Sequence, residues 1–325
     1  MLLKTLKGRH LLLLIFVPFL ILGFWLPSFV DPKSLTGSIP QMPLYNLLQN
    51  ITGHSLIALN ICGWILAVIM AFLMVRLNER YVFIRQRTVL PAFIFAVIFC
   101  GTISLKGVHP SFLSAFLLFL AIDRVFSIYH GASTLSKSFD VGLLLGLATL
   151  FYLFSVFFFI WFCISLAILG YFRGREIFAG LLGFTTPVFL VVCWYFWFDA
   201  LDQFIENVNQ LYHLHHLVLP VSIFQQVFWG VLGLLLVLSS LYMINVVEEK
   251  KISSRKYFMI LLIFFTFCLA IYFLFTGAGI ELYYLAVIPL TYILSHYFVL
   301  QKHKWIGEVL FLILILSSLL LVILR

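Results

Sequence analysis

The sequence has very little charge. Only 10% of its 325 residues are Asp, Glu, Lys or Arg, whereas 64% are hydrophobic and the mean hydropathy is +1.15. In a typical water-soluble domain roughly a quarter of all residues are charged. The shortage of charge therefore excludes a soluble globular domain and indicates a chain that lipid covers over most of its surface.

Several signatures of common functions are also missing. No Walker loop, GxSxG or GxGxxG occurs in a setting that would confirm it, and HExxH is absent, so nucleotide binding and known hydrolase chemistries have no support. The five cysteines lie inside apolar runs without a CxxC pair, which indicates apolar packing rather than a redox or disulfide framework. The basic residues form short clusters and no continuous stripe, which argues against nucleic acid as a partner despite a net charge of +8.

What the chain does have is a series of long apolar runs. A helix crosses a bilayer in about 20 residues, so these runs predict an all-α, polytopic transmembrane helical bundle of about eleven spans that uses residues 1–325 as a single domain. The first run follows three basic residues but lacks a small-residue cleavage site, as a retained signal anchor does. The predicted spans are 11–30, 55–75, 89–105, 111–122, 141–153, 155–172, 177–198, 222–244, 257–276, 282–300 and 305–324.

The basic residues orient this bundle. With the N-terminus in the cytoplasm, all of the 20 Lys and Arg residues except Lys33, Lys106 and Arg325 fall on the cytoplasmic side. Such an asymmetry is typical of inner-membrane proteins, and it places the C-terminus outside. Lys137 and Arg173 both belong on the cytoplasmic side, so the chain must cross the membrane an even number of times between them. Residues 141–172 are therefore predicted to form a tight hairpin of two spans that turns near Phe154–Ser155.

The polar chemistry gathers on the predicted outer face. Asp31 directly follows the first span and is a candidate general base or metal ligand at the membrane surface; alternatively, it ends a span next to Pro32. In Pro43–Thr52 the apolar residues recur at helical spacing and the polar residues lie between them. This pattern predicts an amphipathic helix that lies along the interface.

A second outer segment, 199–220, contains no Lys or Arg. Spacings of three and four residues place six side chains on one face of a predicted helix. They are Asp199, Asp202, Glu206, Asn209, His213 and His216. We interpret the stripe either as a solvated face of an interfacial helix or as ligands for a divalent cation, with Asp202, Glu206 and His213 as candidate catalytic residues. A zinc site at His213, His215 and His216 is a weaker alternative.

Three further positions stand out. Glu281 follows Gly277 and Gly279 and either begins a span or provides a carboxylate to an outward cavity. His109–Pro110 forms a short outer turn that a substrate could approach. Asp123 and Arg124 are expected to form a local charge pair at the cytoplasmic end of a span.

Two resemblances follow from these patterns. The stretches Pro110–Arg124, Gly146–Tyr152 and Lys302–Glu308, with Pro289, resemble an uncharacterised family of polytopic inner-membrane proteins of Bacteroidetes, which has no assigned activity. The acidic residue after the first span and the amphipathic outer helix resemble the GT-C superfamily of membrane glycosyltransferases. That resemblance implies a sugar donor linked to a polyprenyl phosphate and a base or metal-ligand role for Asp31. Pro32 stands where a second acidic residue is typical, and a soluble outer domain is lacking.

The sequence therefore predicts a multi-pass protein of the bacterial inner membrane that acts in envelope biogenesis. The preferred hypothesis is a GT-C-like transferase with membrane lipids and a polyprenyl-phosphate-linked substrate as partners. The alternatives are a non-enzymatic subunit that assists other envelope membrane proteins and, third, a transporter of lipids or small molecules. No particular cofactor is indicated beyond the divalent cation considered above.

Overall fold

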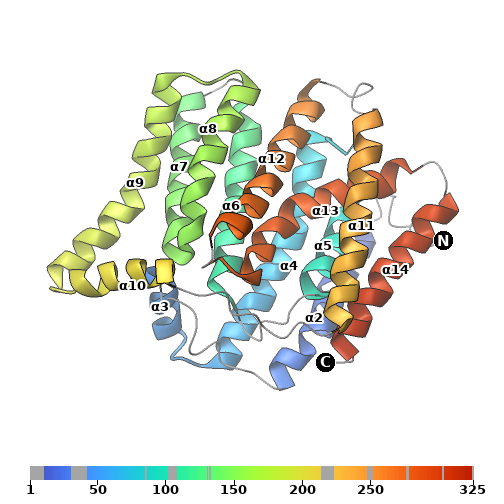
Figure 1. Ribbon diagram of the computed structural model, residues 1–325, viewed down its shortest axis with the longest axis horizontal. Coiled ribbons are helices and arrows are strands. Elements are labelled where there is room, and N and C mark those ends of the chain that lie inside the picture. Colours follow the sequence, from blue (N-terminus) through green and yellow to red (C-terminus); the bar gives the residue numbers. More distant parts are fainter. Residues whose placement is uncertain are drawn as a thin grey trace.

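The computed structural model describes residues 11–30, 42–84, 86–101, 108–129, 131, 133–213, 223–246, 252–275, 278–301 and 304–323. Over these ranges the chain is helical and contains no β-strand. Most helices run along one common axis and form a single bundle (Figure 1). The prediction of an all-α helical bundle is confirmed.

Each of the eleven predicted apolar segments contains one principal helix. These helices are α2 (Phe16–Val30, preceded by a 3-10 turn, Leu11–Ile15), α4 (Leu56–Tyr81), α5 (Leu90–Gly101), α6 (Pro110–Ile128), α7 (Thr134–Phe151), α8 (Phe158–Leu169), α9 (Gly174–Trp197), α11 (Ile223–Val246), α12 (Ile252–Leu274), α13 (Tyr283–Leu300) and α14 (Lys304–Ile323). In the described residues, eight helices are long and apolar enough to cross a membrane, whereas α5, α8 and α14 offer shorter apolar stretches. The chain thus has the helices of a multi-pass membrane protein, and the count of eleven spans stays a prediction.

The hairpin expected within residues 141–172 is present as two helices. Tyr152 adopts an extended conformation after α7, and a 3-10 turn, η2 (Leu153–Phe157), leads into α8. The predicted start of the first helix was wrong, because α7 begins at Thr134 and includes Lys137 and Asp140. These polar residues lie in the first two turns, where a helix end emerges from the apolar part of the bundle.

Polar contacts join neighbouring helices at both ends of the bundle. At one end, the Lys137 ammonium of α7 donates to the Ser127 carbonyl of α6, and the Lys256 ammonium of α12 donates to the Leu169 carbonyl of α8. At the other end, the amide of Asn60 at the start of α4 donates to the Ser28 carbonyl near the end of α2. The first two contacts and the third therefore lie at opposite ends of the bundle. Below, these are called the basic end and the opposite end; which compartment each one faces stays a prediction.

The core is built around α13. Every residue from Tyr283 to Val299 is buried, and α5, α6, α11 and α12 all pack against this helix. Buried tyrosines tie it to its neighbours: the Tyr283 hydroxyl donates to the Ile98 carbonyl at 3.0 Å, and the Tyr292 hydroxyl donates to the Met74 carbonyl at 3.0 Å. A hydrogen bond that is shielded from water fixes the register of such a helix, because each donor would otherwise be left unsatisfied.

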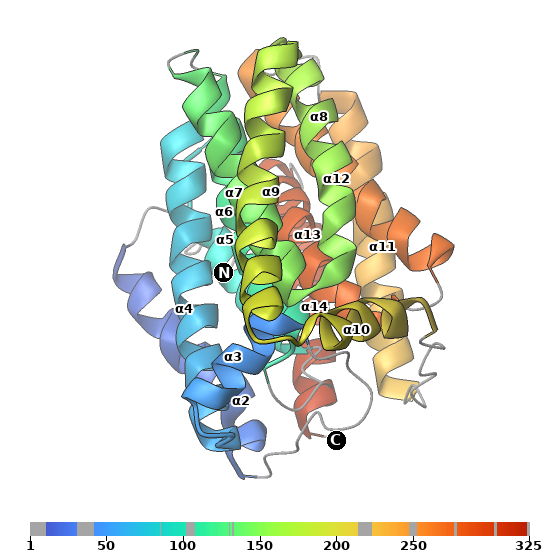
Figure 2. The ribbon, with the colours of Figure 1, turned by 90° about the vertical axis from the view of Figure 1, so that its left-hand side faces the viewer.

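Two short helices lie at the opposite end. α3 (Pro43–Ile51) and α10 (Leu201–His213) are neighbours there, and α10 runs across the foot of α9 in both views (Figures 1 and 2). The amphipathic helix predicted at 43–52 is confirmed, and its orientation is specific: Tyr45 is buried and its hydroxyl donates to the Val108 carbonyl, whereas Leu47 and Ile51 are exposed. Leu44 and Leu48 are half-buried and Leu48 packs on the core, so only part of the apolar face of α3 is turned away from the protein.

Exposed apolar side chains continue along α9. They include aromatic residues at its last turns, Trp194, Phe196 and Trp197, close to the corner with α10. Tryptophan and other aromatic residues collect where a membrane meets water. The crosswise α10 and this aromatic corner together indicate a membrane–water boundary at the opposite end of the bundle.

Candidate functional site

An apolar cavity lies among α11, α12 and α13 in the half of the bundle nearer to the opposite end. Its volume is about 430 Å³, which is within the size range of small-molecule sites. Its walls are formed by Trp229, Leu232, Gly233 and Leu236 from α11, by Phe265, Cys268, Leu269 and Tyr272 from α12, and by Gly279, Leu282, Tyr283, Ala286 and Leu290 before and within α13. No charged residue is among the described residues that line it. We call this space the α11–α13 cavity.

The packing of three helices explains the cavity. α11 and α12 each pack on α13 rather than on one another, and Figure 1 shows α13 between them. On the α11 side, the Trp229 ring meets the Tyr283 ring edge-on at 4.6 Å. Leu269 and Tyr272 line the cavity and are themselves 41% and 43% exposed, so the cavity reaches the surface of the bundle. Its opening therefore lies between α11 and α12.

Glu281 lies beside this cavity. It belongs to a short 3-10 turn, η4 (Ile280–Leu282), and its neighbours Gly279 and Leu282 line the cavity. The side chain is half-buried and folds back, so that its Oε1 accepts a hydrogen bond from the Gly279 N–H at 3.0 Å. The structure thus brings one of the predicted site residues to a cavity.

Tyr152, between α7 and η2, was not among the predicted site residues. It is 6% exposed, and its hydroxyl has no hydrogen-bond partner in the described part of the chain. Tyr152 is not among the described residues that line the cavity. The turn that holds Tyr152 is fixed by packing of Phe154 and Phe157 on Phe275 at the end of α12.

The acidic residues of α10 are not part of this site. Asp202 and Glu206 are both exposed on α10, as the solvated-face interpretation expects. The predicted stripe is shorter than the sequence pattern implied, because Asp199 lies before the helix with a left-handed backbone (φ 51°). His213 is the last residue of α10, and its side chain, like Asp31, His215 and His216, lies outside what the structure describes. Among the described residues, no group of three His, Cys, Asp or Glu side chains could hold a metal ion.

His109 has a structural role. Its Nδ1 accepts the backbone N–H of Ser111 at 3.1 Å and lies 2.6 Å from the Ser111 hydroxyl, so the imidazole caps the first turn of α6. The ring also stacks on Tyr284. Burial lowers the pKa of His109 to about 3, and the imidazole is therefore neutral at physiological pH. These contacts favour a plain turn over a substrate approach.

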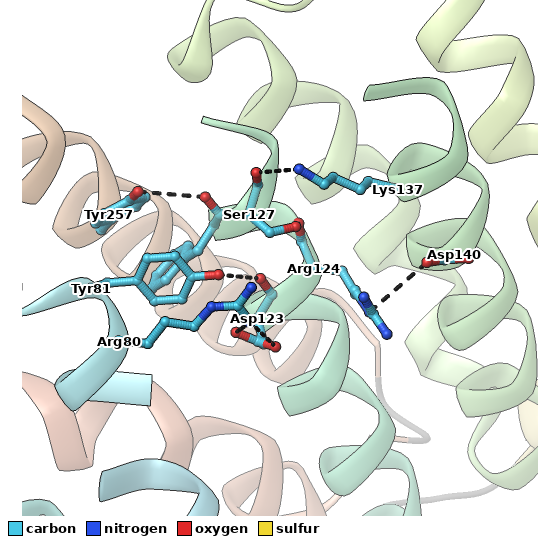
Figure 3. A network of polar contacts seen from close by, with 9 residues as sticks. Arg80, Tyr81, Asp123, Arg124, Ser127, Lys137, Asp140 and Tyr257 are labelled. Atoms are coloured by element: carbon cyan, nitrogen blue, oxygen red, sulfur yellow. Dashed lines mark hydrogen bonds and ion pairs between the residues drawn. The ribbon is translucent and has the colours of Figure 1, made fainter. Parts of the chain in front are cut away.

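The charged network at the basic end joins four helices (Figure 3). The prediction of a local Asp123–Arg124 pair was wrong, because Arg80 donates to both Asp123 oxygens at 3.3 Å and Arg124 pairs with Asp140 at 3.9 Å. Successive helical residues point in different directions, so neighbours such as Asp123 and Arg124 find partners on different helices.

Tyrosines complete the same network. The Tyr81 hydroxyl donates to the Asp123 carbonyl at 3.2 Å, and the Tyr257 hydroxyl donates to the Phe126 carbonyl at 3.4 Å. Arg80 is 54% exposed, so its ion pair contributes little stability, about 0–1 kcal/mol. We interpret this cluster as a set of contacts that hold the helix ends together rather than as a reaction centre.

Two buried polar residues away from the cavity walls escaped the sequence analysis. Tyr152 lies within an apolar stretch without a polar pattern around it, and only its place at the predicted hairpin marks it. Glu176 is a buried carboxylate in the first turn of α9, where its Oε1 accepts from the Thr134 hydroxyl at the start of α7 at 3.3 Å. Carboxylates are favourable near helix N-termini, which explains this position. Glu176 lies just before an apolar run, whereas charged candidate residues were sought inside such runs.

Comparison with known proteins gives one match. A family model described as a family of unknown function (DUF6427) matches residues 35–325. No curated protein and no solved structure matches the chain. The matched residues include all of those that line the cavity.

Proposed function

The chain belongs to the DUF6427 family of unknown function, and we propose that it is a multi-pass protein of the bacterial inner membrane that binds one lipid molecule in the α11–α13 cavity. The observation that carries the proposal is an apolar cavity of ligand size that reaches the surface of a bundle of apolar helices. The part of the surface near its opening is also apolar, with Leu234 and Val237 of α11 more than half exposed. A lipid chain could enter from the bilayer without crossing water.

The chemistry of the walls favours hydrocarbon over a water-soluble ligand. A polar ligand would need several hydrogen-bonding groups to replace its hydration, and the walls are almost entirely aliphatic and aromatic. An empty apolar space leaves its lining atoms without dispersion partners, which a flexible chain would supply. The same walls would accept the isoprenoid chain of a polyprenyl lipid.

The wider role that we propose is envelope biogenesis, and a transfer reaction at the predicted outer face is the second candidate function. Glu281 favours it, because a carboxylate beside a bound lipid could act as general base on an acceptor hydroxyl. The donor would be a sugar linked to a polyprenyl phosphate. The non-enzymatic alternative is a subunit that presents the bound lipid to another envelope membrane protein.

Gly233→Phe tests the proposed lipid site. Gly233 lines the cavity, and a Cβ added there meets no atom within 4 Å, so the new ring can enter the cavity without moving the backbone. We expect the purified variant to lose most of the lipid that stays with the wild-type protein in mild detergent, at least about tenfold. Lipid mass spectrometry of the two preparations, normalised to protein, measures this loss.

Gly230→Phe is the matched control. Gly230 lies on the same helix, is exposed, also has open space around its Cβ, and is not among the residues that line the cavity. This variant is expected to retain the wild-type lipid. Equal lipid retention in both variants and the wild-type protein would contradict binding in the cavity.

A further inference from the structure

We infer that a small monovalent cation, Na⁺ in preference to K⁺, binds between the first turns of α7 and α9 at the basic end of the bundle. Its protein ligands are the Glu176 carboxylate and the hydroxyls of Thr134 and Ser138. The site is independent of the α11–α13 cavity, which lies among other helices. The evidence is a pair of buried oxygen atoms without partners at one helix contact, Glu176 Oε2 and Ser138 Oγ.

Glu176 has a carboxylate whose charge no neighbouring side chain balances. The residue is 5% exposed, and its Oε1 accepts a hydrogen bond from the Thr134 hydroxyl at 3.3 Å. Its Oε2 is buried without a hydrogen-bond partner, and no ion pair joins Glu176 to a Lys or Arg in the described ranges. Arg173 and Arg175, close by in the chain, are exposed. The N-terminus of α9 offers only about half an elementary charge, so a further positive charge is needed.

The Ser138 hydroxyl supplies the second atom without a partner. Ser138 is fully buried, and its Oγ makes no hydrogen bond to any described residue, although a serine in a helix can donate to the carbonyl four residues back. Ser138 lies one turn after Thr134 on α7, and side chains four residues apart are neighbours on a helix surface, about 5–6 Å apart at Cβ. The Ser138 hydroxyl therefore lies one turn from the hydroxyl that Glu176 contacts.

The packing of α7 on α9 limits the space for the ion. The two helices lie side by side (Figures 1 and 2), and their contacts follow the same order along both chains. Thr134 contacts Glu176, and two turns later a Cβ added at Gly142 would overlap the carbonyl oxygen of Gly180. Ser138 lies between these two contacts. Because the helix backbones touch one turn beyond Ser138, the site favours Na⁺ over the larger K⁺.

The chemistry of the three side chains favours a monovalent cation. Hard cations prefer oxygen ligands, and water often completes their coordination shell. One carboxylate balances one positive charge, whereas a divalent cation calls for further carboxylates, and the described residues contain no group of three His, Cys, Asp or Glu side chains that could hold a metal ion. A bridging water molecule would satisfy the hydrogen bonds but leave the buried charge unbalanced.

Thermal unfolding of the purified full-length protein in a neutral detergent tests the site. NaCl replaces choline chloride at constant total salt, so the ionic strength stays fixed and the organic cation is too large to enter. We expect Na⁺ to raise the melting temperature saturably by at least about 3 °C, because a ligand that binds only the folded state stabilises it. KCl at equal concentration is expected to give a smaller rise.

Four variants locate the ion. Glu176→Gln is expected to abolish the difference between Na⁺ and choline, and Ser138→Ala to increase the Na⁺ concentration for the half-maximal rise about fivefold, since one ligand is lost. Asp140→Asn removes a carboxylate of α7 that pairs with Arg124, and Ser165→Ala removes a buried hydroxyl that donates to a carbonyl of its own helix. Both of these controls are expected to keep the wild-type response to Na⁺.

Equal melting temperatures of the wild-type protein in NaCl and choline chloride would overturn the cation site and indicate a bridging water. A wild-type Na⁺ response in Glu176→Gln would overturn the assigned ligands. Binding of radiolabelled Na⁺ to the wild-type protein is a second measurement, which does not depend on the folding of any variant. We expect unlabelled Na⁺, and not choline, to displace the label; a label that is not retained would also overturn the site.

Discussion

Gly142→Val is expected to destabilise the bundle strongly, because α7 and α9 touch through their backbones. A Cβ at Gly142 would overlap the carbonyl oxygen of Gly180, and a Cβ at Gly183 would overlap the carbonyl oxygen of Phe139. α7 and α9 share the most extensive contact of any helix pair in the described chain, and both views show them side by side (Figures 1 and 2). A valine would force these helices apart along their length.

The size of the effect follows from the rigidity of the contact. The overlapping atoms belong to helix backbone and cannot rotate away, so we expect a loss of at least about 3 kcal/mol, the upper range for overpacking. Thermal unfolding in detergent, followed by size-exclusion fluorescence, should show a melting temperature lower by at least ~5 °C. Gly230→Val, at an exposed position with open space, is expected to behave as the wild type; equal melting temperatures for all three proteins would contradict the backbone contact.

Trp161→Ala is expected to have the second large effect. The Trp161 ring is fully buried between α8 and α12, meets the Phe264 ring edge-on at 5.2 Å, and donates from Nε1 to the Ile260 carbonyl at 3.0 Å. Truncation leaves a void that a well-packed core fills only in part, so the expected loss is about 3–5 kcal/mol. Thermal unfolding measures it.

Trp194→Ala is the control for this substitution. Trp194 is 65% exposed near the end of α9, so its removal leaves no void inside the bundle. We expect its melting temperature to stay close to that of the wild type. If Trp161→Ala and Trp194→Ala were equally stable, α8 and α12 would not be packed as described.

Much of the fold could be predicted from the sequence because the membrane imposes long apolar runs. A turn near Phe154–Ser155 was predicted from hydropathy and charge parity, and η2 (Leu153–Phe157) lies there. The orientation drawn from the basic residues stays a prediction. The start of α7 was misplaced because Lys137 and Asp140 look like loop residues. They lie on the helix where it leaves the apolar region, a position that hydropathy alone cannot assign.

Side-chain partners were harder to predict than helices. Asp123 and Arg124 are adjacent in sequence and attracted a local interpretation, but their partners, Arg80 and Asp140, come from α4 and α7. The α7–α9 contact had a local signal in Gly142 and Gly146, four residues apart, which is a small-residue spacing typical of close helix pairs. This spacing predicts a close helix contact for α7 but does not identify α9 as the partner.

The candidate site depended even more on tertiary structure. Glu281 was predicted because a charged residue beside two glycines is conspicuous in an apolar region. The cavity next to it arises because α11 and α12 each pack on α13 and leave a space between them. The sequences of these three apolar helices do not predict how the helices pack on one another.

Photo-crosslinking in native membranes tests most directly whether a lipid occupies the α11–α13 cavity. Cells grown with a diazirine fatty acid incorporate the probe into their lipids, and site-resolved mass spectrometry locates the labels after irradiation. A lipid in the cavity predicts labelling of Cys268 and Leu282, which line it and are only 3% exposed, and loss of these labels in Gly233→Phe. Labels confined to exposed residues such as Phe189 and Leu190 on α9 would contradict the account.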